Sequence, residues 1–184
     1  MKYVLVIFLL LFLFSQSSSV SFAKTPTTLQ QISTISVTYT LPYPGILPDN
    51  PLYGFKVLRD KIVSFFITDA QKQAEFDLLQ ADKRLAAGQY LMQEKTVNQQ
   101  LVSETISKSE NYFGQAVENI AIAKSQGKLV NNFLDTLRLA SIKHQQVLFS
   151  LSQTAKGALK QTLQSDSIRM AGFEKAVNKM KLAK

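Results

Sequence analysis

Side chains able to carry out chemistry are few in this sequence of 184 residues. It contains no cysteine and no tryptophan, and His144 is its only histidine. Thiolate catalysis, disulfide bonds, zinc fingers and multi-histidine metal sites are therefore excluded. His144 shares an apolar seam, at seven-residue spacing, with Leu137 and Leu151. We expect a core or boundary histidine with a hydrogen-bond partner; a pH-sensing or single-ligand role is the alternative.

Acidic and basic residues are interleaved between residues 72 and 84. The acidic residues are Glu75, Asp77 and Asp82, and the basic residues are Lys72, Lys83 and Arg84. On a helix, opposite charges three or four positions apart form solvated ion pairs. We therefore predict ion pairs here, and not an acid/base catalytic pair.

Two other patterns resemble sites but are incomplete. Ser125 and Lys128 have the spacing of serine acyl enzymes, but neither companion motif of those enzymes is present. Asp49 and Asn50 offer too few oxygens for calcium, and we expect them to cap a helix. The seven glycines are scattered, so no phosphate-binding loop is indicated. We predict no catalytic, cofactor-binding or metal-binding residue, and a protein that is not an enzyme.

The first residues have the order of parts of a secretory signal peptide. Lys2 precedes the apolar run Tyr3–Phe14, and small residues at Ser21 and Ala23 suit a signal peptidase. We predict export to the cell envelope or beyond, with residues 1–23 removed. An uncleaved N-terminal anchor is the alternative, although the apolar run would rise only about 18 Å against a hydrocarbon core of roughly 30 Å. No cysteine follows the run, which excludes a lipoprotein.

Proline divides the rest of the chain into two parts. All five prolines precede Leu52, and residues 52–184 contain none. Long helices need such a stretch, because an interior proline removes a hydrogen bond and clashes with the preceding turn. We therefore predict an extended Thr/Ser/Pro-rich segment over residues 24–50 and a helical bundle domain over residues 51–184.

Within the extended segment, apolar and polar residues alternate from Ile35 to Leu41. Alternation with a period of two is typical of an extended chain with one face buried. We expect a strap that lays Ile35, Val37, Tyr39 and Leu41 on the bundle. The alternative is a strand offered to the edge of a partner's sheet.

A compact motif follows, in the run YPGILPDNPLYGFKVLRDKI. Its prolines and Gly45 indicate a rigid connector that leads into the first helix. The run resembles the opening of a family of exported prokaryotic proteins known only as a domain of unknown function. The resemblance implies a signal peptide followed by long helices, reaches to about Gln93, and implies no specific activity. The residues that carry it are Tyr43, Pro44, Gly45, Leu47, Pro48, Asp49, Pro51, Leu52, Tyr53, Lys56 and Asp60.

Apolar periodicity and end signals predict long helices over residues 51–66, 69–95 and 97–126, a fourth from about residue 129 and a last one over 168–182. Thr68 with Gln71 matches a capping box, and Gly127 suits a C-terminal cap. Gly157 or the cluster 165–167 is expected to interrupt the fourth helix. In the first helix, apolar residues fall at helical spacing at Leu52, Phe55, Leu58, Ile62, Phe65 and Phe66. The fold predicted is an all-α antiparallel bundle of four to five long helices with an extended Pro-rich N-terminal strap.

Positive charge is concentrated at the C-terminal end. The chain carries 21 basic and 13 acidic residues, and 11 of the basic but only three of the acidic ones lie between residues 124 and 184. Residues Met170, Phe173, Val177 and Met180 form one stripe of the last helix. The cations lie largely off it, at Arg169, Lys175, Lys179, Lys181 and Lys184. This helix either closes the bundle or contacts an anionic surface; nucleic acid is disfavoured because no aromatic residues alternate with the cations.

These observations predict an exported, non-catalytic helical protein without cofactors. The favoured function is a binding or adaptor module of the cell envelope. Its partner would be an anionic lipid or polymer, or another envelope protein, met through the C-terminal cations. The alternatives are a structural protein that self-associates through the coiled-coil seam of the fourth helix, and an extracytoplasmic sensor domain.

Overall fold

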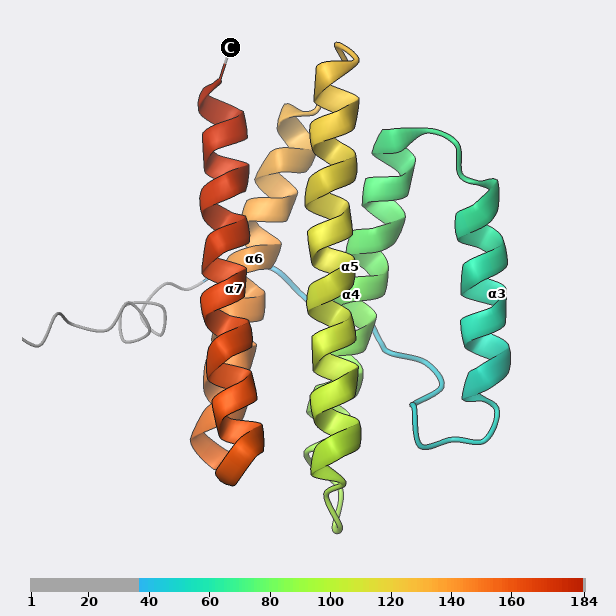
Figure 1. Cartoon of the computed structure of the whole chain (residues 1–184), viewed down its shortest axis with the longest axis vertical. Coiled ribbons are helices and arrows are strands. Elements are labelled where there is room, and N and C mark those ends of the chain that lie inside the picture. The colour runs from blue at the N-terminus through green and yellow to red at the C-terminus, as the bar shows by residue number, and fades with distance from the viewer. Residues whose placement is uncertain (1–36, 184) are drawn as a thin grey trace, which may run out of the picture.

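The computed structural model describes residues 37–183 of the chain (Figure 1). The helices in this part are α3 (Tyr53–Phe66), α4 (Ala70–Leu91), α5 (Gln99–Ser125), α6 (Asn131–Thr154) and α7 (Gly157–Leu182). Residues 37–183 contain no strand, and the predicted all-α class is confirmed. The predicted signal peptide and its cleavage site lie outside the described residues.

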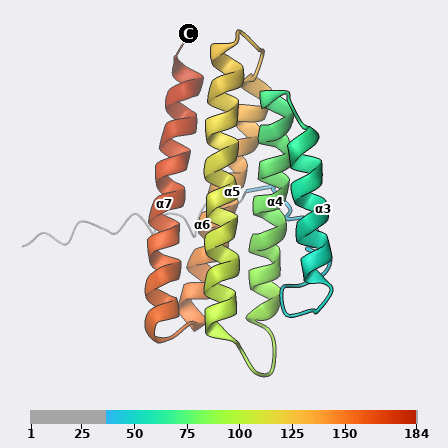
Figure 2. The ribbon, with the colours of Figure 1, turned by 45° about the vertical axis from the view of Figure 1, so that its right-hand side comes forward.

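Helices α4 to α7 form a four-helix bundle of two antiparallel hairpins (Figures 1 and 2). α4 packs against α5, and α6 against α7; the hairpins meet where α5 lies beside α7 and α4 beside α6. Because the chain direction alternates from helix to helix, the two cross-hairpin pairs are parallel. The predicted bundle of four to five long helices is confirmed, with α3 as a fifth helix at the edge, beside α4.

The core is apolar and draws on all four helices of the bundle. Its fully buried side chains include Leu85 of α4, Phe113 of α5, Leu137 of α6 and Met170 of α7. On the heptad seam of α6, His144 is also fully buried, and Leu151 packs against the core while partly exposed. The seam is therefore used inside one chain, and self-association through it would require the bundle to open.

Several helix ends follow local sequence signals. Asp69 Oδ1 accepts hydrogen bonds from the backbone N–H groups of Gln71 (2.9 Å) and Lys72 (3.1 Å), so Asp69 caps α4 in place of the predicted Thr68. α5 ends as predicted at Gly127, whose φ of 79° suits glycine. There the backbone N–H of Lys128 donates to the Ala123 carbonyl, which completes a Schellman-type turn.

The last helix is longer than predicted. α7 begins at Gly157 and continues without interruption through residues 165–167 to Leu182. Gly157 therefore marks the break, and the expected end at the Ser165–Ser167 cluster is wrong. The reason is burial: Asp166 and Ser167 face the bundle, so this polar cluster belongs to the inward side of a continuous helix.

The strap comprises residues 37–50. Thr38 and Thr40 are exposed, whereas Tyr39 and Leu41 pack against the core, as the alternation predicts. Ile35 lies outside the described residues. At the end of the strap Asn50 Oδ1 accepts from the backbone N–H of Leu52 at 2.9 Å. This bond stabilises a turn before the helix. α3 begins at Tyr53, two residues later than predicted, with Leu52 at its N-cap and no side-chain cap, so the expected capping by Asp49 and Asn50 is wrong.

At Gly88, α4 packs closely against Ile106 of α5. A Cβ placed there would lie 2.6 Å from Cγ1 of Ile106, whereas a Cβ at Gly172 of α7 would have no neighbour within 4 Å. Gly88→Ala should lower the free energy of unfolding by about 1 kcal/mol or more, because overpacking costs exceed the gain in helix propensity. Gly172→Ala should raise it by about 0.5–1 kcal/mol. Urea unfolding of both variants checks the opposite signs; equal effects would contradict the close packing.

Candidate functional site

Helix α3 is turned so that its apolar residues face solvent. Its only buried residue is the charged Asp60, whereas Phe65 and Phe66 are 82% and 75% exposed. The predicted helix is confirmed, but its apolar stripe does not pack on the bundle. We name this stripe the outer face of α3, formed by Phe55, Leu58, Ile62, Phe65 and Phe66.

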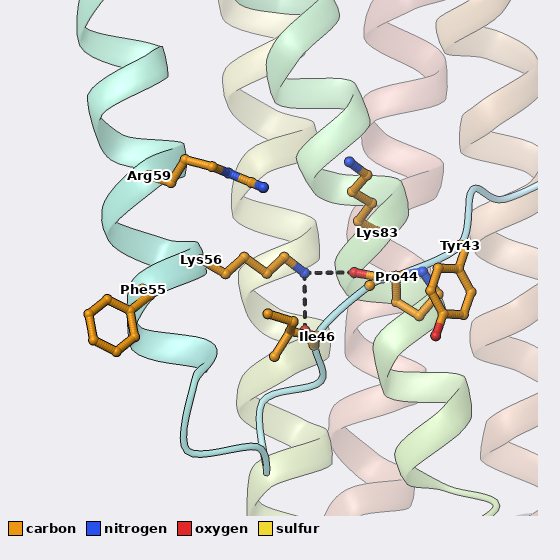
Figure 3. A pocket seen from close by; sticks show the side chains of 8 residues that line it. Tyr43, Pro44, Ile46, Phe55, Lys56, Arg59 and Lys83 are labelled. Carbon is orange, nitrogen blue, oxygen red and sulfur yellow. Dashed lines mark hydrogen bonds between the residues drawn. The ribbon is translucent and has the colours of Figure 1, made fainter.

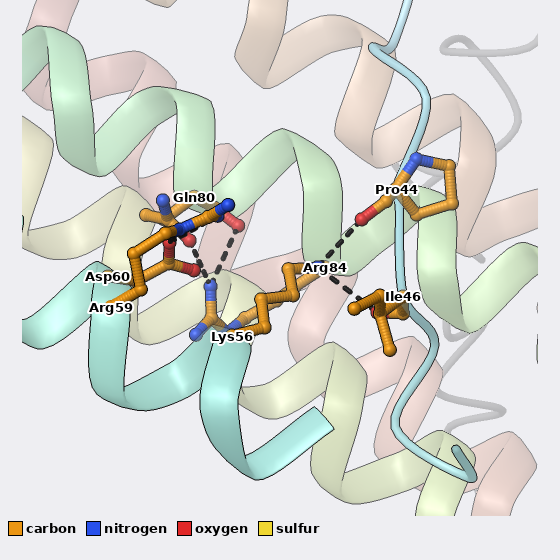
Figure 4. A network of polar contacts seen from close by, with 7 residues as sticks. All are labelled: Pro44, Ile46, Lys56, Arg59, Asp60, Gln80 and Arg84. Atoms are coloured by element: carbon orange, nitrogen blue, oxygen red, sulfur yellow. Dashed lines mark hydrogen bonds and ion pairs between the residues drawn. The ribbon is translucent and has the colours of Figure 1, made fainter. Parts of the chain in front are cut away.

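The opposite face of α3 is polar and lies against α4 and the strap. Ser64 accepts a hydrogen bond from Gln73 of α4 at 3.0 Å. Lys56 Nζ donates to the backbone carbonyls of Pro44 (2.7 Å) and Ile46 (3.2 Å), which ties the helix to the strap (Figure 4). These contacts explain the orientation, because turning the helix over would break the bonds of Lys56 and Ser64 and leave the strap carbonyls of Pro44 and Ile46 without this donor.

A small network of charges continues from Lys56. Arg59 pairs with Asp60 of the same helix at 2.7 Å, and Arg84 of α4 donates to the side chain of Gln80 at 2.8 Å (Figure 4). The Arg84 guanidinium is buried and lies 4.2 Å from the ring centroid of Tyr112. Asp60 Oδ2 and Arg84 Nε have no hydrogen-bond partner among residues 37–183.

A pocket of about 490 Å³ lies between the strap, α3 and α4 (Figure 3). It is lined by Tyr43, Pro44, Gly45, Ile46, Phe55, Lys56, Arg59 and Lys83. Three cations therefore border it, and no acidic residue does. Burial lowers the pKa of Lys56, and the nearby cations Arg84, Lys83 and Arg59 lower it further, while Asp60 opposes them. We name this cavity the motif pocket.

The sequence motif surrounds this region. Pro44 is buried, and Gly45, with a φ of 73°, turns the strap beneath α3. A second hollow adjoins the motif pocket and is bordered by the motif residues Leu47, Asp49 and Pro51, together with Asn50. Tyr53, Lys56 and Asp60 form the inner side of α3, while Leu52 is exposed before the helix begins, and Pro48 lies in the strap. The motif thus builds one local structure that joins the strap to α3.

The C-terminal cations are dispersed on α7. Arg169 donates to Asn111 at 3.0 Å, and Lys181 pairs with Asp135. Lys175 and Lys179 are exposed, and Lys184 lies outside the described residues. The apolar stripe Met170, Phe173, Val177 and Met180 packs into or against the core, so α7 is the closing helix of the bundle.

Buried polar groups link the strap to the bundle. Asp82 accepts from the hydroxyl of Tyr39 at 2.6 Å and lies 2.8 Å from His144 Nε2. His144 is therefore a core histidine with a hydrogen-bond partner, as predicted, and that partner is Asp82. Burial raises the pKa of the Tyr39 hydroxyl, and Asp82 raises it further.

The predicted solvated ion pairs on α4 are not found among the described residues: no salt bridge joins Glu75, Asp77 or Asp82 to a basic residue of α4. Glu75 is exposed, as expected, but Asp77 and Asp82 are buried. Asp77 accepts from Asn119 at 2.9 Å and from Gln73 at 3.0 Å, and burial raises its pKa. The interpretation was wrong for these two residues because the spacing of charges along α4 does not reveal which face the strap and α5 cover.

A second group of buried acids lies between α5 and α7. Both carboxyl oxygens of Glu110 lack a hydrogen-bond partner in the described part of the chain, and burial raises its pKa to about 9. Burial also raises the pKa of Asp166 to about 6, while Arg169 opposes the shift. The sequence contains a signal for this burial, since Glu110 lies at helical spacing between the apolar residues Ile106 and Phe113.

The described residues offer neither a metal site nor a membrane-spanning helix. Among residues 37–183, no group of three or more His, Cys, Asp or Glu side chains could hold a metal ion. Nor does any helix of this part have the length and apolar character needed to cross a bilayer. Ser125 donates to the Ile122 carbonyl and Lys128 pairs with Asp69, so their spacing reflects two separate structural contacts.

The fold and the pocket define an all-helical bundle protein with a cation-lined cavity at the junction of its strap and edge helix. The family model described as Domain of unknown function (DUF5667) matches residues 45–163, so the chain belongs to this family. The match begins within the motif and extends well beyond Gln93, into α7. No curated protein matches the chain, and no solved structure matches it.

Proposed function

We propose that this protein is an exported, non-catalytic binding module of the cell envelope that lies on an anionic membrane surface through the outer face of α3. One observation carries the proposal: the apolar stripe of α3 faces solvent while a core exists beside it. Soluble proteins rarely expose a contiguous apolar surface of this kind unless it binds something.

Charge around the outer face favours lipid as the occupant. At 3.6 residues per turn, Arg59 and Lys61 border the stripe on opposite sides. An interfacial helix has this pattern, with aromatic and aliphatic residues in the acyl boundary and cations level with the headgroups. In a symmetric dimer through the same face, the cations of two copies would come together and repel.

The outer face of α3 is a better candidate than the C-terminal cations. α7 offers exposed charge, but its apolar stripe is already packed in the bundle. α3 and α7 also lie on opposite sides of the bundle (Figures 1 and 2), so one flat surface would not cover both. The predicted signal peptide supports export, which would place the protein beside a membrane.

Vesicle binding tests the proposal. The protein is produced with its own leader and mixed with vesicles that contain phosphatidylglycerol, or with vesicles of phosphatidylcholine alone. We expect salt-sensitive binding to the anionic vesicles, and the double variant Phe65→Ser, Phe66→Ser should bind at least about tenfold more weakly, because each buried phenylalanine contributes about 1.5–3 kcal/mol. Both side chains are exposed, so the bundle should stay folded.

The matched control is the double variant Lys175→Gln, Lys179→Gln on α7. It should bind vesicles nearly as well as the parent protein, since those cations would face away from the membrane. Loss of binding in the control but not in the α3 variant would move the site to the C-terminal cations. If the parent protein ignores anionic vesicles and forms a dimer in light scattering that the α3 variant loses, self-association replaces membrane binding.

A further inference from the structure

The motif pocket holds more positive charge than its own structure uses. Lys56, Arg59 and Lys83 border it and no acidic residue does, while Asp60 of the same helix is already paired with Arg59. Lys83 makes no hydrogen bond or ion pair with any described residue, although it is half-buried. Cations gathered without matching acids repel one another, and a bound anion would remove that cost.

The donors of the pocket are only partly used. An ammonium group has three N–H donors, and Lys56 directs two bonds to the carbonyls of Pro44 and Ile46. Arg59 uses Nε and one terminal nitrogen for Asp60, which leaves its other terminal nitrogen without a partner in the described part. Donors therefore converge from α3 and α4 on one cavity, as an oxyanion with several acceptor oxygens requires.

The position of the pocket connects it with the outer face of α3. Phe55 belongs to the lining of the pocket and also to the outer face, and its ring points away from Lys56, Arg59 and Lys83 (Figure 3). Arg59 lies at the border between the two. If α3 lies on a membrane, the mouth of the pocket is at the level of the headgroups. Its volume of about 490 Å³ falls within the range of small-molecule sites.

We infer that the motif pocket binds the phosphodiester group of an anionic lipid headgroup, with Lys56, Arg59 and Lys83 as the contacting residues. The inference rests on the proposed function for the source of the anion. Lys56 has a second role, since its bonds to the strap set the shape of the cavity. Gly45 is a positioning residue, because its left-handed turn places the carbonyls of Pro44 and Ile46 that hold Lys56.

A soluble probe tests the pocket apart from the membrane. Glycerophosphoglycerol, the deacylated headgroup of phosphatidylglycerol, is titrated against the protein and followed by NMR. Lys83→Gln should weaken its binding about tenfold, because a charged hydrogen bond to the phosphate is lost. Lys61→Gln is the same change at the border of the outer face opposite Arg59, and it should change the affinity less than about twofold. Neither residue has a partner among those described, so both variants should fold.

The second arm uses vesicles that contain phosphatidylglycerol. Lys83→Gln should weaken vesicle binding more than Lys61→Gln does. The variant Phe65→Ser, Phe66→Ser should lose vesicle binding and keep its affinity for glycerophosphoglycerol. If the parent protein binds vesicles but the soluble headgroup has no effect, the pocket inference fails while the proposed function stands.

Another outcome would contradict the proposed function itself. If the protein binds glycerophosphoglycerol but no vesicles, the proposed function fails and with it the lipid source of the anion. Titration with inorganic phosphate distinguishes a free anion: tighter binding of phosphate than of glycerophosphoglycerol, together with equal vesicle binding by Lys83→Gln and Lys61→Gln, would overturn the headgroup assignment.

Discussion

Replacing Asp82 by alanine should lower the free energy of unfolding by about 3 kcal/mol or more. Asp82 is only 4% exposed and is shared by the Tyr39 hydroxyl and His144 Nε2. Its removal takes the partner from the buried His144 Nε2 and from the part-buried Tyr39 hydroxyl, and each unsatisfied buried group costs about 1–3 kcal/mol. The loss should exceed that of Tyr39→Phe, which removes only the bond from the strap and costs about 1 kcal/mol.

Urea unfolding followed by circular dichroism measures these differences. Glu75→Ala is the matched control, because Glu75 is an exposed acid on the same helix. Its effect should stay within about 0.5 kcal/mol. An Asp82→Ala variant as stable as this control would show that the Tyr39–Asp82–His144 network does not hold the strap on the bundle.

Replacing Glu110 by glutamine should raise stability at neutral and alkaline pH and have little effect in acid. Burial raises the pKa of Glu110 from its ordinary value of 4.5 to about 9, so the folded protein holds this carboxyl neutral. Below pH 4.5 the unfolded chain is protonated as well, and folding takes up no proton. Above it the unfolded chain releases the proton while the folded chain keeps it, and stability falls as the pH rises toward 9.

The size of this effect follows from the same shift. Each pH unit between the two pKa values costs about 1.4 kcal/mol, so the penalty at pH 7 is about 3 kcal/mol. Asp166 adds a smaller penalty of the same sign, because burial raises its pKa from 3.8 to about 6. Glutamine carries no proton to lose and removes the larger part of this pH dependence.

Thermal unfolding from about pH 4 to pH 9 provides the measurement. The Tm of Glu110→Gln should exceed that of the parent most strongly at the alkaline end and converge with it in acid. Glu118→Gln is the control, since Glu118 is an exposed acid on α5 and should leave the profile unchanged. A constant offset across the pH range would contradict a neutral buried Glu110.

The helical architecture could be predicted because its causes are local. A chain without proline after Pro51 permits long helices, and Gly127 ends α5 through a backbone angle that glycine adopts readily. Helix ends were less predictable where two cap residues are neighbours. Thr68 and Asp69 both suit an N-cap, and only the geometry shows that Asp69 accepts the bonds.

The direction in which a helix faces was not predictable. An apolar stripe is ordinarily a core-facing stripe, and α3 has one. In the fold the polar side of α3 packs against the strap and α4, because Lys56 donates to carbonyls of the strap and Ser64 accepts from Gln73 of α4. These partners are distant from α3 in sequence or lie on another element, so the periodicity of α3 itself does not contain them.

The candidate site was likewise predictable from the sequence only in part. The motif identified Lys56 and Asp60, but Arg59 and Lys83 join the pocket only because α3 and α4 are side by side. Likewise the acids Asp82 and Glu110 are at ordinary helical positions, and their burial depends on which neighbouring helix or strap covers them.

By itself, the sequence determined that this protein is a proline-free helical body behind an extended strap, with a motif joining the two, since backbone sterics and apolar periodicity act within one segment. The tertiary structure alone decided that α3 turns its apolar face outward, that three cations share one pocket and that carboxyl groups lie in the core. The physical reason is that burial and electrostatic fields depend on what surrounds a side chain, and those neighbours come from other segments of the chain.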